Sequence, residues 1–372
     1  MTSTSAAPVP RESADDVSSS AERERGVARA ALEELLLPPV VALLVATVVG
    51  DLLIVTFGQS PGEVYRLLLE GTWGNAYGLG QVLYKATTLA LTGLAIAFAL
   101  RAGLFNIGAE SQLAAGGFLA AVVGLALPAG LPWLVTLPVY VAAAILGGGT
   151  VGGVAGVLKA RFGAHEVITT IMLNFIVLAL LSYLTAAQLK VPETLHTPEI
   201  HSGALPRLSD AFQAFHGSAA NWALLLAIAA CPIASWYLFR TRRGFELRAV
   251  GLQPAAAEYG GVKVGAVWSR AMTISGAIAG LGGLNYVLGY KHYYEEGFAG
   301  GAGFLGIAVA LVGRNHPLGV ALAALLFATI SQGGLAVNAL VPKQFVDVLQ
   351  AVVIIAVAVA VPEVRRRLGV RS

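Results

Sequence analysis

The sequence predicts an all-α polytopic membrane protein with about ten transmembrane helices and with both termini in the cytoplasm. Of its 372 residues, 56% are hydrophobic and only 12% are charged, and the mean hydropathy is +0.74. A soluble domain carries about 25% charged residues, so this composition excludes an ordinary soluble protein. Apolar runs of about 20 residues recur along the chain, and Lys and Arg are unevenly shared between the segments that separate them.

The apolar runs define ten predicted spans. Nearly all of them are long enough to cross the hydrocarbon layer of a bilayer, which is about 30 Å thick, as a helix. The eighth is short, as expected of a tilted or broken helix that is buried among others. The predicted spans are residues 39–57, 83–100, 106–127, 133–157, 167–187, 221–239, 266–289, 301–313, 317–335 and 345–361.

The distribution of basic residues predicts the orientation. With the N-terminus inside, 18 of the 24 Lys and Arg residues fall in cytoplasmic segments and 6 fall outside. Residues 1–35 are then a disordered cytoplasmic tail with an interfacial helix, residues 36–362 the transmembrane domain, and residues 363–372 a basic cytoplasmic tail. The first apolar run begins near Pro39, which is too late for a normal cleavable signal peptide.

Two segments stand out on the predicted outer side. The sequence Ser60-Pro61-Gly62-Glu63 has the form of a capping box with proline at the first helical position, and it predicts a short surface helix through Leu69. The second segment is the external loop of residues 188–220, which holds three of the six histidines without the spacing of metal ligands. We interpret it as a solvated loop, with a docking surface for an external partner as the alternative.

A polar stretch of residues 241–264, TRRGFELRAVGLQPAAAEYGGVKV, lies between two predicted spans on the cytoplasmic side. Pro254 suits a first helical position, and residues 255–258 are strong helix formers. Gly260 and Gly261 can end the helix in a left-handed conformation. A short helix is therefore expected between two spans, in water or at the membrane surface; the alternative is an ordinary basic loop.

Many of the 44 glycines lie inside predicted spans. Residues 147–156, GGGTVGGVAG, formally match GxGxxG, but a dinucleotide loop needs a soluble strand–turn–helix context. We interpret Gly148, Gly152 and Gly156 as a helix face of small residues that allows a neighbouring helix to approach closely.

Polar residues inside the spans are the candidates for a substrate pathway, because such residues are costly in a membrane. The cluster GLFNIGAESQ, residues 103–112, predicts a helix break or a re-entrant bend, with the alternative that its glutamate only caps a helix start. A second cluster, HEVITTIMLN, spans residues 165–174, although threonines often only bond their own helix. An asparagine in the seventh span could equally be an interhelical hydrogen bond. The candidates are Asn106, Glu110, Gln112, Glu166, Thr169, Thr170, Asn174 and Asn285.

These side chains favour a neutral polar solute, because amides and hydroxyls can serve sugar hydroxyls or a nucleobase edge, whereas an ion path would need charged rings. No GxxxxGK[ST] loop occurs, and no Ser/His/Asp or metal constellation indicates an enzyme. The single cysteine, Cys231, excludes a disulfide framework, and no basic patch interleaved with aromatics suggests nucleic acid.

Four stretches together resemble the permease subunits of bacterial ABC importers, in the branch shared by simple-sugar, branched-chain amino-acid and nucleoside systems. The likeness is greatest to nucleoside permeases that work with basic-membrane-protein-type lipoproteins, and it covers roughly residues 35–362. One departure is Ser111, where the family usually has glycine, which puts a close backbone contact there in doubt. The stretches are GLFNIGAESQ (103–112), EVITTIMLNF (166–175), RGFELRAVGLQPAAAEYGGV (243–262) and GFLGIAVALVGRNHPLGV (303–320).

The resemblance implies two inverted-topology halves, spans two to five and seven to ten, around a pathway. It also implies three kinds of partner besides the lipid bilayer: a second homologous permease, cytosolic ABC ATPases that use ATP and magnesium, and an extracytoplasmic substrate-binding lipoprotein. The chain itself would be no enzyme and bind no cofactor. In such importers a cytoplasmic helix between spans fits a groove in the ATPase. The implied coupling residues are Glu246, Arg248, Gly251, Leu252, Pro254, Ala256, Glu258 and Tyr259.

The sequence thus predicts a multi-pass permease of the bacterial cytoplasmic membrane that moves nucleosides inward by alternating access. One alternative is a permease of the same type for a simple sugar or another neutral solute. A second is an ion-coupled secondary transporter, which would need an essential carboxylate within the membrane. Glu110 and Glu166, the acidic candidates near spans, both lie toward the cytoplasmic ends, which argues against it.

Overall fold

The computed structural model describes residues 44–189, 191–342 and 344–367, and these residues are mostly α-helix with no strand. The predicted tail of residues 1–35 and the last residues of the basic tail, 368–372, lie outside the described residues. The predicted class, an all-α polytopic membrane protein, is confirmed for the part of the chain that is described.

The helices follow the predicted spans in order. A helix over Leu44–Thr56 comes first, and π-helical turns extend α6 and α11 at Thr185–Leu189 and Val287–Lys291. The longer helices are α2 Pro61–Thr72, α3 Ala76–Leu100, α4 Ala109–Ala126, α5 Trp133–Phe162, α6 Glu166–Leu184, α8 Ala223–Arg240, α9 Arg242–Leu252, α11 Val264–Tyr286, α12 Ala302–Val312, α13 Pro317–Ala336 and α14 Gln344–Arg367, with the short α7 Leu208–Ala211 and α10 Pro254–Tyr259 between them.

Fewer helices than ten pass the length and composition test for a membrane span. Within the described residues seven do, or eight if Leu44–Thr56 and α2 form one bent span. The predicted span 301–313 is α12, whose 11 residues extend about 16 Å at 1.5 Å per residue, roughly half of the hydrocarbon layer. The predicted tenth span lies in α14, of which the apolar described part is Val346–Ala356.

The surface helix predicted after Ser60 is α2, but its cap differs from the prediction. The Ser60 side chain makes no capping hydrogen bond, so the expected capping box is wrong. The Ser60 carbonyl instead accepts from the amides of Glu63 and Val64, both at 3.1 Å. The first turn is therefore closed by the backbone, after a proline that has no N–H to satisfy.

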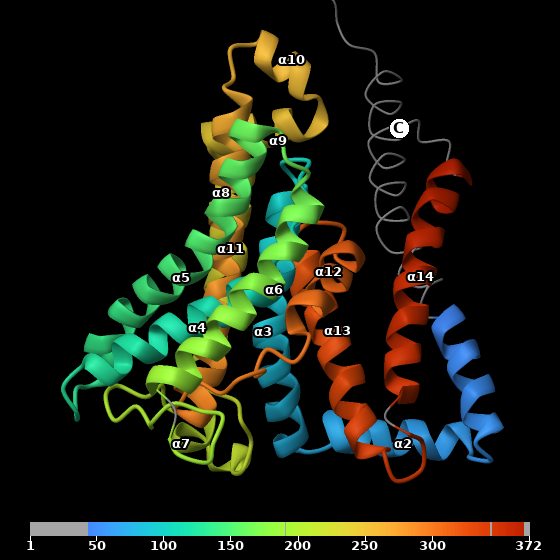
Figure 1. Cartoon of the computed structure of the whole chain (residues 1–372). Coiled ribbons are helices and arrows are strands. Elements are labelled where there is room, and N and C mark those ends of the chain that lie inside the picture. Colours follow the sequence, from blue (N-terminus) through green and yellow to red (C-terminus); the bar gives the residue numbers. More distant parts are fainter. Residues whose placement is uncertain (1–43, 190, 343, 368–372) are drawn as a thin grey trace, which may run out of the picture. The chain divides into compact units, whose positions relative to one another are not determined.

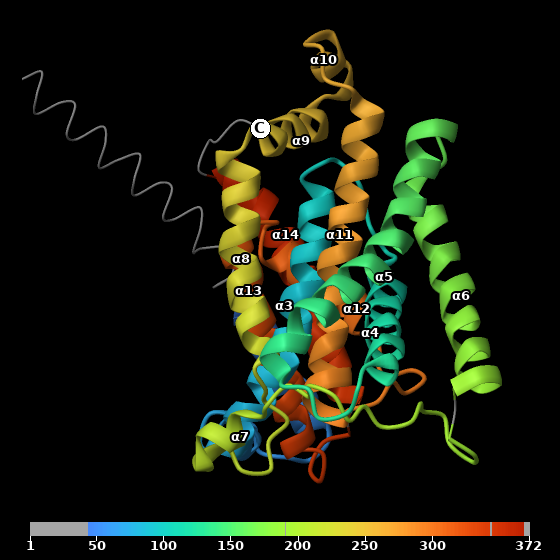
Figure 2. The same ribbon diagram turned by 90° about the vertical axis from the view of Figure 1, so that its left-hand side faces the viewer.

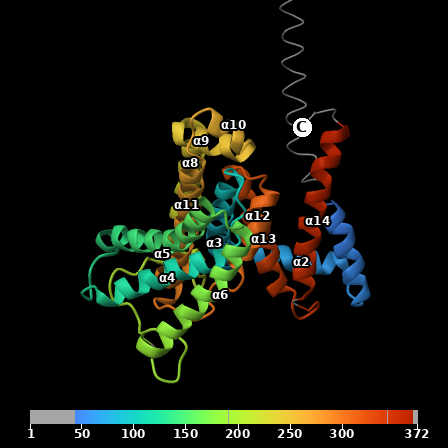
Figure 3. The same ribbon diagram turned by 45° about the horizontal axis from the view of Figure 1, so that its top comes forward.

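The two long helices α3 and α11 pack against each other, and each also packs against two helices from the other half of the chain. Helix α3 contacts α12 and α13, whereas α11 contacts α4 and α5. Figures 1 and 3 show α3 with α4 and α5 on one side and α12 and α13 on the other. Helices α3–α5 of the first half and α11–α13 of the second are therefore interlocked by reciprocal contacts.

The glycine face predicted in the fourth span lies in the contact between α5 and α11. A Cβ atom on Gly148 would lie 2.2 Å from the carbonyl oxygen of Gly276, and one on Gly280 would lie 2.3 Å from that of Ala144. Gly152 approaches the backbone of Met272 equally closely, at 2.3 Å. The two helix backbones are thus in direct contact, which confirms the packing interpretation.

The polar stretch 241–264 and the loop 188–220 lie at opposite ends of the bundle. Figures 1 and 2 show α9 and α10 at one end and α7 at the other. The predicted short helix is confirmed as α10, Pro254–Tyr259, and Gly261 follows with a φ of 84°. Helix α9, Arg242–Leu252, precedes it and was not predicted.

Replacing Gly148 with alanine is expected to lower the free energy of unfolding by about 1–3 kcal/mol, because the new methyl group would overlap a backbone carbonyl. The matched control is Gly149→Ala on the same helix, whose Cβ would meet Thr273 O at an ordinary 3.5 Å. Thermal unfolding of the purified protein measures both. Equal midpoints for the two variants would contradict the close α5–α11 contact.

Candidate functional site

The connection between α3 and α4, residues 101–108, turns back into the bundle before α4 begins. The Nδ2 of Asn106 donates to the hydroxyl of Ser275 at 2.8 Å, and that hydroxyl donates to the carbonyl of Ala95 at 2.6 Å. Ala95 lies five residues before the end of α3, about 8 Å along the helix. The first of the two expected arrangements, a helix break inside the bundle, is therefore present.

Asn106 and Gln112 form a reciprocal pair of amides across the break. The Nδ2 of Asn106 donates to Oε1 of Gln112 at 2.8 Å, and Nε2 of Gln112 donates back to Oδ1 of Asn106 at 3.0 Å. The same Oδ1 accepts from the backbone N–H of Gly108 at 3.0 Å. Both side chains are fully buried, so their polar atoms are satisfied within the protein.

Two polar side chains of α6 form hydrogen bonds with the backbone at the break. Asn174 donates to the carbonyl of Ile107 at 2.9 Å and accepts from the N–H of Ser111 at 3.1 Å. The hydroxyl of Thr170 accepts from the N–H of Ile107 at 3.3 Å. Backbone groups released by a helix break must find partners inside the protein, and α6 supplies them here.

Glu110 caps a helix, but not the one on which it lies. It stands in the first turn of α4, and its two carboxylate oxygens accept from the N–H of Gly301 at 2.8 Å and of Gly303 at 2.7 Å. These amides begin α12, which is also held by Thr92 of α3, whose hydroxyl donates to the Ala302 carbonyl at 3.2 Å. A carboxylate at a helix N-terminus satisfies free N–H groups and opposes the positive end of the helix dipole.

The opposite end of α12 is held by the same connection. Nε of Arg101, which follows α3, donates to the carbonyl of Asn315 at 2.8 Å, just beyond the C-terminus of α12. A cation near a helix C-terminus complements the negative end of the dipole. Arg101 and Glu110, nine residues apart, therefore fix both ends of α12.

Asn285 does not join the cluster around Asn106. It lies on α11 and donates to the Tyr84 carbonyl at 2.8 Å and to the Thr88 hydroxyl at 2.9 Å, both in α3. Its own Oδ1 accepts from Nδ2 of Asn221 at 2.9 Å. This second polar contact ties α11 to α3 nearer the other end of α3.

Glu166 and Thr169, two candidates from the predicted cluster 165–174, also lie apart from the cluster around Asn106. Glu166 forms an ion pair with Lys159 at 2.8 Å, across the turn between α5 and α6. The hydroxyl of Thr169 bonds only the carbonyls of His165 and Glu166 in its own helix turn. The hydroxyl of Thr169 therefore serves its own helix, which is the alternative expected for threonines in a helix.

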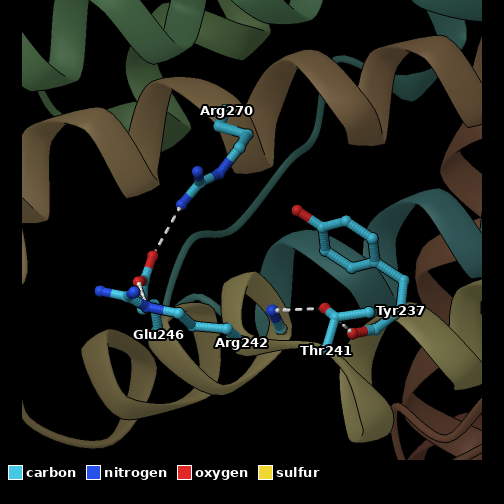
Figure 4. Close-up of polar contacts among 6 residues, drawn as sticks. Tyr237, Thr241, Arg242, Glu246 and Arg270 are labelled. Carbon is cyan, nitrogen blue, oxygen red and sulfur yellow. Dashed lines mark hydrogen bonds and ion pairs between the residues drawn. The ribbon is translucent and has the colours of Figure 1, made fainter.

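At the other candidate site, α9 is fixed to α8 and α11. Thr241 caps α9 by accepting from the N–H of Gly244 at 3.0 Å. Glu246 lies between two guanidinium groups, with Arg242 of its own helix at 3.1 Å and Arg270 of α11 at 3.4 Å (Figure 4). This shared carboxylate is the polar link between α9 and α11.

The C-terminal turn of α9 also touches the connection that leads to the break. A Cβ atom on Gly251 would lie 2.2 Å from the carbonyl oxygen of Arg101, so the two backbones are in contact. The guanidinium groups of Arg248 and Arg101 lie 5.2 and 5.6 Å from the centroid of the Phe239 ring, within the range of cation–π attraction.

Helix α10 projects beyond the bundle. Leu252 before it is 85% exposed and Tyr259 at its end is 97% exposed, so the described part of the chain leaves two large side chains uncovered. Ala257 is the residue of α10 that is buried. The other implied coupling residues in this helix, Pro254, Ala256 and Glu258, are exposed.

The comparisons with known proteins agree with these features. Residues 78–358 match the family described as branched-chain amino acid transport system, permease component. The chain belongs to this permease family. The permease is 38% identical to the guanosine ABC transporter permease protein NupP of Bacillus subtilis, over 87% of this chain and 93% of the relative.

Two further relatives cover similar lengths. The nucleoside ABC transporter permease protein NupB of Lactococcus lactis is 34% identical over 87% of this chain and 90% of its own. The glucose ABC transporter permease protein TsgB13 of Haloferax volcanii is 33% identical over 85% of each chain. No solved structure gives a significant match to the permease.

Sequence reasoning missed several residues that make the polar contacts around the break, around α12 and around Asn285. Ser275, Asn221 and Thr92 are single polar residues in or beside apolar runs, and nothing in their local sequence separates them from helix residues that bond their own backbone. The doubt about Ser111 was misplaced. Its side chain is buried and donates to the Gly108 carbonyl at 3.0 Å, while the close backbone approach is made by Gly303 to Glu110.

The variant Glu110→Ala is expected to destabilise the permease by about 1–3 kcal/mol for each of the two α12 amides that lose their acceptor. Glu110→Gln keeps one acceptor oxygen and should lose less. The control is Glu63→Ala, which removes an exposed carboxylate from the first turn of α2 and should change the free energy of unfolding by under about 0.5 kcal/mol. Thermal unfolding compares the three, and an unchanged midpoint for Glu110→Ala would contradict the cap.

Proposed function

We propose that the chain is the permease subunit of an ABC importer that moves nucleosides across the bacterial cytoplasmic membrane by alternating access. The observation that carries this proposal is the path from α10 to the break. The exposed helix α10, with two uncovered large side chains, follows α9, whose Gly251 lies against Arg101. Arg101 begins the connection that contains Asn106 and leads to Glu110 in the first turn of α4. A force applied to α10 therefore has a short route to the polar cluster.

The proposed topology has ten spans in two inverted halves with both termini in the cytoplasm. It is supported by the ratio of 18 to 6 for basic residues on the two sides. The reciprocal packing of α3 with α12 and α13, and of α11 with α4 and α5, is what two inverted repeats would produce. The position of α10 and α7 at opposite ends agrees with one being cytoplasmic and the other external.

The proposed substrate class is the nucleosides. Two relatives that cover most of the chain are named for guanosine and for nucleosides. Amides and hydroxyls that can pair with a base edge or a ribose are gathered at the break, and in this conformation they pair with one another. Reorientation of the halves would exchange these internal bonds for bonds to the solute.

The second candidate is a permease of the same type for a simple sugar, because one relative is named for glucose. The ion-coupled alternative is less favoured, since Glu110 is used as a helix cap and Glu166 is paired with Lys159. The proposed partners are cytosolic ABC ATPases that use ATP and magnesium, a second permease subunit and an extracytoplasmic substrate-binding lipoprotein. The permease itself would bind no cofactor.

Uptake of labelled guanosine in cells that express the complete importer tests the proposed function. We expect deletion of this permease alone to abolish saturable uptake, and excess unlabelled nucleoside, but not glucose, to compete in cells that retain it. Guanosine uptake that persists unchanged after deletion would refute the nucleoside assignment. Loss of labelled-glucose uptake in the same deletion strain would then assign the sugar alternative.

The variant Gly251→Ala tests coupling through α9. The added methyl group would push α9 away from the Arg101 carbonyl, and we expect uptake to fall at least about tenfold while ATP hydrolysis by the assembled importer continues. The matched control is Gly260→Ala at the other end of α10, where a Cβ meets nothing closer than 3.4 Å. Normal uptake by Gly251→Ala, or equal losses in both variants, would contradict this route.

A further inference from the structure

A cavity of about 320 Å³ lies between α9, the end of the 260–262 turn and the start of α11. Three cationic side chains line it, from Arg242, Lys263 and Arg270, together with the single carboxylate of Glu246. Three positive charges and one negative charge leave the lining with a formal net charge of +2. A water molecule takes about 30 Å³ of liquid volume, so the cavity would hold a phosphate group together with several waters.

The carboxylate in this cavity does not satisfy the cations around it. Glu246 receives Nε of Arg242 on one oxygen and Nη2 of Arg270 on the other (Figure 4). The Nε of Arg270 is buried and has no hydrogen-bond partner among the residues that the structure describes. A buried charged donor without an acceptor is costly, so the arrangement lacks an acceptor on the side of Arg270.

Two other features of the cavity also suit an anion. Lys263 is exposed at its edge and makes no ion pair with any residue of the described part of the chain. Lys263 is the N-cap of α11, a helix of 23 residues, and its side chain does not cap the first amides. The free amides and the positive end of the helix dipole therefore add to the field of the three cations.

We propose that this cavity binds a phosphate group, carried either by the head group of an anionic phospholipid or by a free phosphate compound. Phosphate offers several acceptor oxygens in the geometry that guanidinium groups and a lysine prefer. The cavity lies at the end of the bundle that bears α10, which the proposed topology places in the cytoplasm, where basic pockets between helices meet acidic head groups. The bound phosphate would stabilise the contact of α9 with α11, whichever solute is carried.

The test uses the permease assembled with its ATPase subunits in nanodiscs of phosphatidylcholine, with or without phosphatidylglycerol. The midpoint of thermal unfolding is measured against the concentration of inorganic phosphate, with chloride at matched ionic strength as the reference. Since ATPase subunits bind phosphate themselves, the comparison is between permease variants. Lys263→Gln removes a lining cation, and Arg243→Gln removes an exposed cation of α9 that does not line the cavity.

We expect Lys263→Gln to weaken the apparent phosphate affinity at least about tenfold, or to abolish the stabilisation by phosphatidylglycerol, while Arg243→Gln behaves as the wild type. A response to inorganic phosphate identifies a free compound, and a response to phosphatidylglycerol alone identifies a lipid. Arg270→Lys is the second variant. It keeps the charge beside Glu246 but lacks the forked donor, and it should also weaken binding.

Three results would overturn the proposal. The first is that neither phosphate nor phosphatidylglycerol shifts the wild-type midpoint beyond the chloride reference. The second is an equal loss in Lys263→Gln and Arg243→Gln, which would indicate only diffuse charge. The third is weaker retention of the ATPase subunits by Lys263→Gln with unchanged phosphate affinity, which would assign the cavity to the partner protein.

Discussion

The carboxylate of Glu110 determines how the central part of this permease is assembled. It lies on the first turn of α4, yet it satisfies two amides at the start of α12, in a helix that reaches only about half-way through the hydrocarbon layer. Glu110 is buried, and amides inside the protein without an acceptor would be costly. The position of α12 is therefore set by α4, and Arg101 fixes its other end. The segment from Arg101 to Glu110 and the short helix α12 are thus joined at both ends of α12.

The contacts of Glu110 and Arg101 with α12 depend on close packing of the helices around them. The long helices α3 and α11 hold the broken helices of the opposite half, and glycines at Gly148, Gly276 and Gly280 let α5 and α11 touch through their backbones. Association of helices in lipid gains little from the hydrophobic effect, so backbone approach and hydrogen bonds must supply the stability. The amide pair of Asn106 and Gln112 then has a fixed scaffold.

The sequence predicted features that depend on local pattern. Apolar runs located most of the helices, proline and glycine located α10, and the glycine spacing identified the α5 face. The sequence could not show which amides share a partner, because the bond from Asn106 to Ser275 joins residues 169 apart. The expected cap by Ser60 failed because a backbone carbonyl took its place. Ten spans were expected from hydropathy, with the eighth short, and α12 is that short helix; hydropathy did not show that the apolar described part of α14 is also short.

The contact between Gly251 and Arg101 has a mechanical consequence. It consists of main-chain atoms, whereas most contacts between protein elements are made through side chains that can change rotamer and absorb a small displacement. A contact without side chains has almost no compliance. A shift of α9 would therefore be passed directly to the main chain at Arg101, whose side chain bonds the Asn315 carbonyl just beyond α12. The proposed coupling route therefore includes one rigid, main-chain step between α9 and the connection 101–108.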